Sequence, residues 1–311
     1  MAKNSLDPVG TLSIGNVVTT STILYRSNFK RYLQVSLRAT AWLVALGAAT
    51  VGFIAVGDLL FTATQSWLVF VPVSLGWIGI TLYLMAKYAT DRAVICRLAY
   101  QELIDAPETV SVATEHLRPR TWGFLRLSWL VGLYMFLIAF VGYIAFAVAV
   151  GLVAGILSAL VPSPGVFTYI IIGILVIALV VLWIVLVIRF YAYWFVAELP
   201  MAIESTNSAS VSMRRSRQLS STAVRTLVLI ITVAFLITLP ISGLSSAPSL
   251  IGQLMTLSDS QSTIATGSFL VFLGFLLNVA IELFVMPFWQ IIKAIVYFDL
   301  RNRREGADLI I

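Results

Sequence analysis

Six uninterrupted apolar runs dominate this sequence and leave few folds open to it. A helix needs about 20 residues to cross a hydrocarbon core about 30 Å thick, and the runs are close to that length or longer. They lack alternation at every second residue and exceed the length of barrel strands, so they indicate helices. The six expected spans are Leu37–Phe61, Leu68–Ala89, Leu127–Ala159, Phe167–Phe195, Leu227–Leu244 and Phe269–Phe298.

Composition agrees with membrane burial. Of the 311 residues, 60% are hydrophobic and only 11% are charged, whereas soluble domains carry roughly a quarter charged residues. The single cysteine, Cys96, excludes an intramolecular disulfide. The start, Met1 to Pro8, is polar and is not expected to be a removable signal peptide. We predict an all-α polytopic membrane protein, with residues 1–311 forming a single membrane domain.

The basic residues predict the orientation of the spans. Three long stretches contain no Lys or Arg. They lie between Arg38 and Lys87, between Arg126 and Arg189, and between Arg225 and Lys293. Each stretch covers an odd-numbered run, the loop after it and most of the next run. Positive residues concentrate on the cytoplasmic side of membrane proteins. The pattern therefore predicts cytoplasmic termini and cytoplasmic second and fourth connections.

A repeated plan is expected to organise the chain. Stretches that mix basic and apolar residues precede the odd spans, at Ser21–Leu33, His116–Leu127 and Ser208–Leu227. They suit amphipathic helices lying in the head-group layer, or else plain flanks of the next span. Acidic residues that end the even spans, at positions 102, 198 and 299, are separated by 96 (198 − 102) and 101 (299 − 198) residues. This spacing predicts three units, at about 11–105, 106–205 and 206–311.

The last span carries the most informative polar residues. Glu282 lies in its apolar middle, where a carboxylate costs about 2.5 kcal/mol or more. Asn278 is one turn earlier, and Gln290 and Lys293 continue the polar stripe. Two hypotheses remain open. The stripe is a polar track for a proton, an ion or a lipid head group, or it forms hydrogen bonds that lock helices together.

Basic side chains at the predicted cytoplasmic ends are candidates for binding lipid head groups or a partner protein. Arg189 reaches either for lipid phosphates or for an acid, Glu282 or Glu198, and Arg92 has the same alternatives. The full set of candidates is Arg26, Lys30, Arg31, Arg120, Arg126, Arg189, Arg214, Arg215, Arg217, Arg225, Arg301, Arg303 and Arg304.

Three segments give the chain a family resemblance. They are Leu24-Tyr-Arg-Ser-Asn-Phe-Lys30, Met213-Arg-Arg-Ser-Arg-Gln-Leu219 and Tyr297-Phe-Asp-Leu-Arg-Asn-Arg-Arg-Glu-Gly-Ala-Asp-Leu309. The chain resembles bacterial proteins related to the glycerophosphodiester phosphodiesterase membrane domain. The resemblance implies a multi-span helical module, sometimes joined to a soluble phosphodiesterase domain. That domain's chemistry needs metal-binding acids and histidines, and His116 is the only histidine here, so its enzymatic activity is not expected.

The sequence contains no phosphate-binding loop, no metal-ligand spacing and no nucleophile elbow. We therefore expect no enzyme, no cofactor, no metal and no nucleic-acid partner. The leading expectation is a module of a bacterial inner or other internal membrane that binds lipid head groups or a protein partner and organises an assembly. Anionic lipids are the expected partners, along with a larger membrane-protein complex or a homo-oligomer. The alternative is a transporter or channel that uses the Glu282 and Asn278 stripe, with a membrane-embedded lipid enzyme as a minor third class.

Overall fold

The computed structural model describes residues 13–160, 165–204, 206, 208–258 and 260–306. Every regular element among them is helical. The long helices are α2 (Phe29–Thr64), α3 (Phe70–Leu103), α5 (Thr121–Leu160), α6 (Val166–Trp194), α9 (Val224–Thr256) and α10 (Gln261–Glu305). Within the described residues, six helices are long and apolar enough to cross a membrane. The predicted all-α class and the six apolar spans are confirmed, and this is the make-up of a multi-pass membrane protein.

Short helices stand before and between the long ones. They are α1 (Ile14–Ser27), η1 (Trp67–Val69), α4 (Val110–Leu117), η2 (Arg118–Arg120), α7 (Glu198–Ile203) and α8 (Ala209–Ser220). A short helix thus precedes each of the hairpins α2–α3, α5–α6 and α9–α10. The same order of elements, a short helix followed by a hairpin, therefore occurs three times. An internal repeat of structure stays a prediction.

The boundaries of the stretches expected at the membrane surface are wrong in two of three cases. Asn28 interrupts the stretch Ser21–Leu33, because its backbone angles (φ −116°, ψ 25°) are not helical, so the stretch is divided between α1 and α2. The stretch His116–Leu127 belongs mostly to η2 and to the first turns of α5. Only Ser208–Leu227 holds a separate helix, α8, ahead of its span. In the first two stretches, basic residues such as Lys30 and Arg126 therefore lie in the first turns of the long helices themselves.

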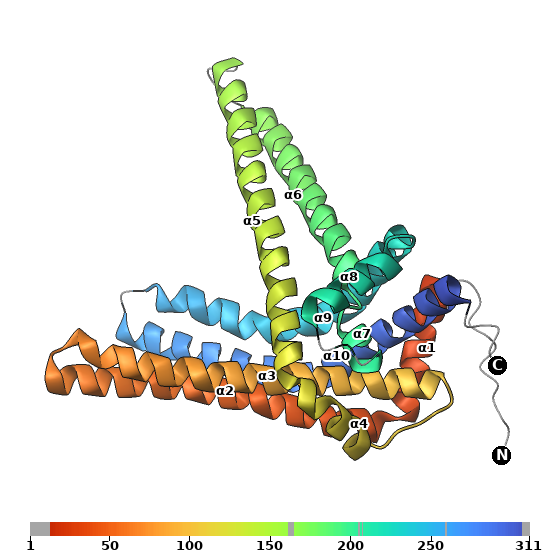
Figure 1. Cartoon of the computed structure of the whole chain (residues 1–311). Coiled ribbons are helices and arrows are strands. Elements are labelled where there is room, and N and C mark those ends of the chain that lie inside the picture. The colour runs from red at the N-terminus through yellow and green to blue at the C-terminus, as the bar shows by residue number, and fades with distance from the viewer. Residues whose placement is uncertain (1–12, 161–164, 205, 207, 259, 307–311) are drawn as a thin grey trace.

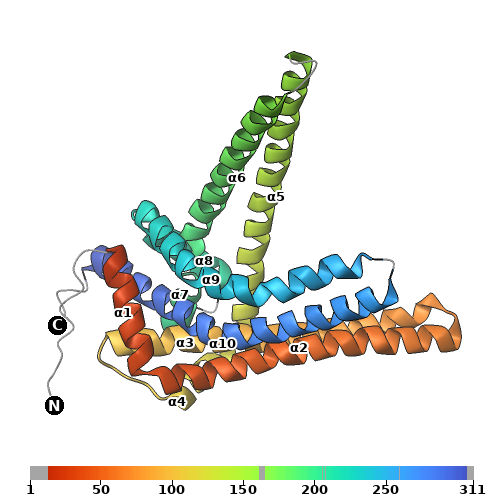
Figure 2. The same ribbon diagram turned by 180° about the vertical axis from the view of Figure 1, so that it is seen from behind.

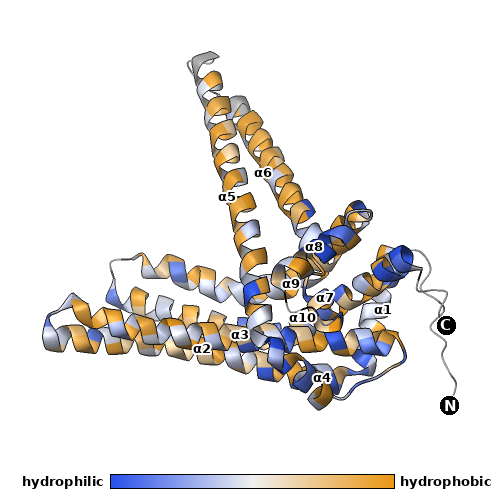
Figure 3. Ribbon diagram, viewed as in Figure 1, coloured by the Kyte–Doolittle hydropathy of each residue, from blue (hydrophilic) through white to orange (hydrophobic). Residues whose placement is uncertain are grey.

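The three hairpins are not equivalent in space. The α2–α3 and α9–α10 hairpins run side by side, whereas α5–α6 points away from both (Figures 1 and 2). Hydrophobic residues predominate along the hairpins, which we call the arms, and polar residues gather around α4, α8 and the C-terminal end of α10 (Figure 3). Many large apolar side chains along the arms, such as Ile177 and Leu254, are largely uncovered by the rest of the chain. Such exposure suits helices that face lipid.

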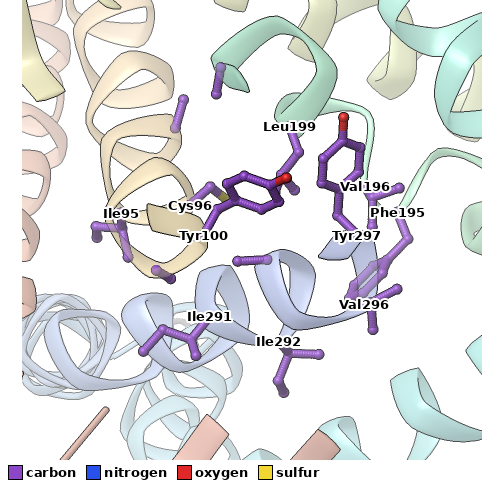
Figure 4. Close-up of a cluster of buried hydrophobic side chains, with 14 of the residues drawn as sticks. Ile95, Cys96, Tyr100, Phe195, Val196, Leu199, Ile291, Ile292, Val296 and Tyr297 are labelled. Carbon is purple, nitrogen blue, oxygen red and sulfur yellow. The ribbon is translucent and has the colours of Figure 1, made fainter. Parts of the chain in front are cut away.

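The buried core lies where the helix ends that the sequence predicts to be cytoplasmic come together. We call this region the hub, formed by the C-terminal half of α3, α7, the end of α6 and the C-terminal half of α10. Cys96 and Tyr100 of α3 face Leu199 of α7 and Tyr297 of α10 (Figure 4). The rings of Tyr100 and Tyr297 meet edge to face, with centroids 5.7 Å apart. The hub therefore joins all three hairpins.

The middle hairpin enters the hub through a break. Helix α6 ends at Trp194, residues 195–197 form a turn, and α7 begins at Glu198. Pro200 has no N–H to donate to the carbonyl of Val196, and Leu199 donates to that carbonyl instead, at 3.1 Å. In the other two units, α3 and α10 continue without a break to Leu103 and Glu305. In the middle unit, the acid Glu198 thus follows a turn and begins a separate short helix.

Candidate functional site

Glu198 is the centre of a buried ion cluster in the hub. The Arg92 guanidinium lies 3.1 Å from Glu198 Oε1, and Lys293 Nζ lies 3.2 Å from Oε2. The side chain of Lys293 is only 4% exposed, and those of Glu198 and Arg92 are 15% and 26% exposed. With all three groups ionised, two cations share one carboxylate, so the cluster carries one excess positive charge.

Gln290 completes this cluster from α10. When the amide is oriented with its nitrogen toward the carboxylate, it donates to Glu198 Oε2 at 3.0 Å and accepts from Arg92 at 3.0 and 3.2 Å. Cys96 is fully buried against the same residues, and its Sγ lies 3.6 Å from the carbonyl oxygen of Gln290. Together, Gln290 and Glu198 orient the guanidinium of Arg92. We call Arg92, Glu198, Gln290 and Lys293 the ion cluster.

Side chains of α8 hold the turn that delivers Glu198. Ser216 Oγ donates to the carbonyl of Tyr193 at 2.9 Å, and Ser212 Oγ donates to the carbonyl of Ala197 at 2.7 Å. Both serines are fully buried. A buried carbonyl without a donor is unfavourable by roughly 1–3 kcal/mol. The serines therefore stabilise carbonyl groups on either side of the break.

Two arginines fix the other end of α7. Arg97 donates to the carbonyl of Ala202 at 2.8 Å, and Arg120 donates to the carbonyl of Met201 at 2.9 Å. Cations at a helix C-terminus satisfy carbonyl groups that have no partner within the helix. Arg97 also pairs with Glu108 through two contacts of 2.8 and 2.6 Å. The helix that begins with Glu198 is thus fastened to α3 and η2.

Glu282 lies beside the ion cluster without joining it. The Tyr88 hydroxyl donates to Glu282 Oε1 at 3.0 Å. The guanidinium carbon of Arg92 lies 5.6 Å from the centre of the same tyrosine ring, at a distance typical of cation–π contacts. Glu282 forms no ion pair with any residue that the structure describes. One tyrosine therefore separates an acid from the excess positive charge.

Asn278 has a different role from Glu282. Its amide nitrogen donates to the carbonyls of Gly274 (2.8 Å) and Ser245 (3.2 Å), and its oxygen accepts from Ser245 and Ser246 at 3.1 and 3.3 Å. All four hydrogen bonds stay within α9 and α10. Asn278 therefore locks two helices, whereas Glu282 faces a cavity. The contacts of Asn278 are those of the helix-locking hypothesis, and a polar track through Glu282 stays a prediction.

Two cavities of about 340 Å³ each lie on either side of the ion cluster. The first, which we call the α9 cavity, is lined by Glu282, Tyr88 and residues of α9 that include Thr238 and Ser242. The second, the α5 cavity, is lined by Glu198 and by side chains of α5 and α6 that are mostly apolar: Leu127, Val131, Met135 and Trp194. Arg92, Tyr191 and Lys293 line both.

A second buried acid shows what a neutral pair looks like in this chain. Asp91 accepts from Arg38 through both oxygens at 3.0 Å and from Trp42 Nε1 at 2.9 Å. Arg38 also donates to Thr114 of α4 at 3.1 Å. One cation and one acid are matched here, and neither lines a cavity described above. This pair fastens α2, α3 and α4 together, and we assign it a structural role.

The remaining basic candidates fall into two groups. Several form ion pairs or hydrogen bonds within the protein: Arg31 with Glu102, Arg120 with Met201, Arg215 with Glu204 and Glu305, Arg301 with Glu305, and Arg303 with Asp299. The others are exposed and have no acidic partner among the described residues: Arg26, Lys30, Arg126, Arg189, Arg214, Arg217, Arg225 and Arg304. Arg189 therefore does not pair with Glu198 or Glu282, and Arg92 takes the place beside Glu198.

Sequence reasoning named Glu282, Gln290 and Lys293 as one polar group, and the structure brings all three to the α9 cavity. It missed Glu198 as the centre, because an acid at the end of a span resembles an ordinary charged flank. The available signal was Pro200, two residues later, which interrupts the helix and turns the acid inward. Tyr88 carried no signal that distinguishes it from the other aromatic residues near span ends.

No protein-family model, no curated protein and no solved structure matches this chain. The resemblance described from the sequence stays a prediction.

Proposed function

We propose that this chain is an integral membrane protein that binds the phosphate of a lipid head group at the ion cluster. In the proposed topology, the hub and both termini lie on the cytoplasmic side of a bacterial internal membrane. The positive-inside pattern supports this orientation. The exposed basic residues around the hub, Arg126 and Arg225 among them, would then lie at the level of anionic lipid head groups.

One observation carries the proposal: Arg92 and Lys293 share a single carboxylate and both line two cavities. An excess charge in a low-dielectric region is unfavourable unless a counter-charge approaches it. Phosphate oxygens fit this need, because a guanidinium donates to them through two N–H groups and an ammonium adds a point charge. Each cavity is within the size range of small-molecule sites.

Lipid binding to the full-length protein in detergent, measured by native mass spectrometry, tests the proposal. The probes are phosphatidylglycerol, which has a phosphate, and diacylglycerol, which lacks one. We expect the wild type to retain phosphatidylglycerol preferentially and Arg92→Gln/Lys293→Gln to lose at least ten-fold in affinity. Arg92→Lys keeps the charge without the forked guanidinium, so its loss should be smaller.

The matched control is Arg126→Gln/Arg225→Gln, which removes two exposed basic residues that immediately precede or begin spans. It should retain phosphatidylglycerol binding at the ion cluster. Equal retention of the two lipids by the wild type would overturn the proposal. So would a control variant that loses as much affinity as the cluster variant.

A second candidate, transport of a lipid-like solute, is favoured by one observation. The α9 cavity reaches Glu282, while close backbone contact between α9 and α10 closes the half of this helix pair beyond Asn278. Fluorescent phospholipid exchange between the leaflets of proteoliposomes is the measurement. Exchange that depends on the wild-type protein and stops in Glu282→Gln would favour transport over binding alone.

A further inference from the structure

Resting on the proposed function, we infer that the two cavities hold one aminophospholipid, with its phosphate at Arg92 and Lys293, its primary ammonium at Glu282 and its acyl chains along the α5 cavity. The inference names the class of lipid and gives Glu282 a task in selecting it. Three observations carry it, one for each part of such a lipid.

The first observation is the unpaired acid. Glu282 lines the α9 cavity, and the Tyr88 hydroxyl is its hydrogen-bond partner among the described residues. A carboxylate in the middle of a span is expected to meet a cation or a donor. Arg92 and Lys293 instead turn to Glu198. A ligand that brings its own ammonium group into the α9 cavity would supply the missing counter-charge.

The second observation is the separation of opposite charges across one side chain. The Arg92 guanidinium lies 5.6 Å from the centre of the Tyr88 ring, and the hydroxyl of that ring lies 3.0 Å from Glu282. The cavity therefore presents a positive group and a negative group on two sides of one phenol. A ligand with a phosphate and an ammonium group two carbons apart complements this pattern. A purely anionic head group would place no positive charge near Glu282.

The third observation is the contrast between the cavities. Leu127, Val131 and Met135 make the α5 wall apolar, and Arg92 and Lys293 stand at the boundary that it shares with the α9 cavity. A phosphate held at that boundary leaves the amine in the α9 cavity, near Glu282, and the hydrocarbon in the α5 cavity. The division between the cavities thus matches the division within a phospholipid.

A primary ammonium fits better than a quaternary one. Three N–H donors can approach the carboxylate of Glu282 within hydrogen-bond distance, whereas trimethylammonium has no hydrogen to donate. We therefore expect phosphatidylethanolamine to bind more tightly than phosphatidylcholine, although the acyl chains and phosphate are the same. Phosphatidylglycerol, with no amine, should also bind less tightly than phosphatidylethanolamine.

Competitive retention of these three lipids by the full-length protein, measured by native mass spectrometry, tests the assignment. We expect the wild type to prefer phosphatidylethanolamine over each of the others by about five-fold or more. Glu282→Gln should abolish this preference without weakening phosphatidylglycerol binding, because the variant removes a negative charge from the cavity that holds the phosphate. Glu282→Asp, which keeps the charge, should retain part of the preference, and Glu115→Gln, at an exposed acid on α4, should retain all of it.

The outcomes separate this inference from the proposed function. If phosphatidylglycerol binds at Arg92 and Lys293 but no lipid is preferred for its amine, the inference fails and the function stands. If no phospholipid is preferred over diacylglycerol, both fail. Free glycerophosphoethanolamine provides the last comparison. Should it displace the intact lipid at equal concentration, the acyl chains contribute nothing and the ligand is a soluble zwitterion, which overturns the assignment to a lipid.

Discussion

At the scale of single residues, the hub depends on an unequal division of charge. Glu198 balances one of its two cations, and Gln290 orients the group without adding charge. Asp91 and Arg38, by contrast, form a neutral pair. An acid that serves two buried cations contributes more to stability than its single charge suggests, because its removal leaves both cations without a partner.

Glu198→Gln should therefore destabilise the protein strongly. The net charge of Arg92, Lys293 and position 198 would rise from +1 to +2, and breaking such buried pairs costs about 3–5 kcal/mol. Because the Arg92 side chain is 26% exposed, we expect the lower end of that range. Equilibrium unfolding in detergent measures the change.

Glu198→Gln/Lys293→Gln restores the net charge of +1 and should recover most of the lost stability. Glu115→Gln, at an exposed acid, serves as the control and should change the unfolding free energy little. If the double variant is less stable than Glu198→Gln alone, the charge argument does not hold.

Single residues also show which parts of the site could be predicted from the sequence. Glu282, Gln290 and Lys293 stand out because polar residues are expensive within an apolar span. Glu198 could not be found in this way, since its neighbours already resemble the end of a helix. Its importance depends on the turn at residues 195–197, which is a property of the backbone.

At the scale of elements, α9 and α10 approach each other so closely that their backbones are in contact. A Cβ added at Gly252 would lie 2.5 Å from the carbonyl oxygen of Gly267, and one at Gly267 would lie 2.7 Å from that of Gly252. A Cβ at Gly274 would meet the backbone nitrogen of Ser249 at 2.6 Å. Small residues at such positions allow two backbones to approach and Asn278 to hydrogen-bond across them.

Gly274→Ala should open this helix pair. The new methyl group would collide with Ser249, whose backbone cannot move away as a flexible side chain would. We expect a loss of about 1–3 kcal/mol, typical of overpacking, and a weaker Asn278 lock. Gly243→Ala is the matched control, because α9 has open space at that position and alanine favours the helix.

Unfolding of both variants in the same detergent gives the comparison. Equal stability of Gly274→Ala and Gly243→Ala would mean that the close approach of α9 and α10 contributes nothing to folding.

At the scale of the whole molecule, the sequence predicted the spans but could not predict how they are arranged. The arms of α5 and α6 are apolar on nearly all sides, so no stripe indicates which face packs against protein and which faces lipid. Side chains such as Val141 and Ile177 remain exposed along the α5–α6 hairpin. Its direction away from the other hairpins is set in the hub (Figure 1).

A flat bilayer should bring the α5–α6 hairpin closer to the α9–α10 hairpin. All six arms must place their apolar length within one hydrocarbon layer, and strongly divergent arms cannot do so together. Spin labels at Leu152 of α5 and Leu250 of α9, both exposed, would report the distance in a variant without Cys96. We expect a shorter mean distance in nanodiscs than in detergent micelles.

Labels at Leu59 of α2 and Leu254 of α9, on the two hairpins that already run side by side, provide the reference. Their distance should be the same in both environments. An unchanged separation between Leu152 and Leu250 would show that the middle hairpin keeps its direction in a membrane.

The short turn between α6 and α7 has a mechanical consequence. Residues 195–197 connect the long helix α6 to the short helix α7. Arg97 and Arg120 hold α7 from its C-terminal end, independently of α6, so a change in the tilt of α6 need not move Glu198 away from Arg92 and Lys293. A membrane of different thickness would then change the tilt of α6, while Arg92, Glu198 and Lys293 of the proposed binding site keep their spacing.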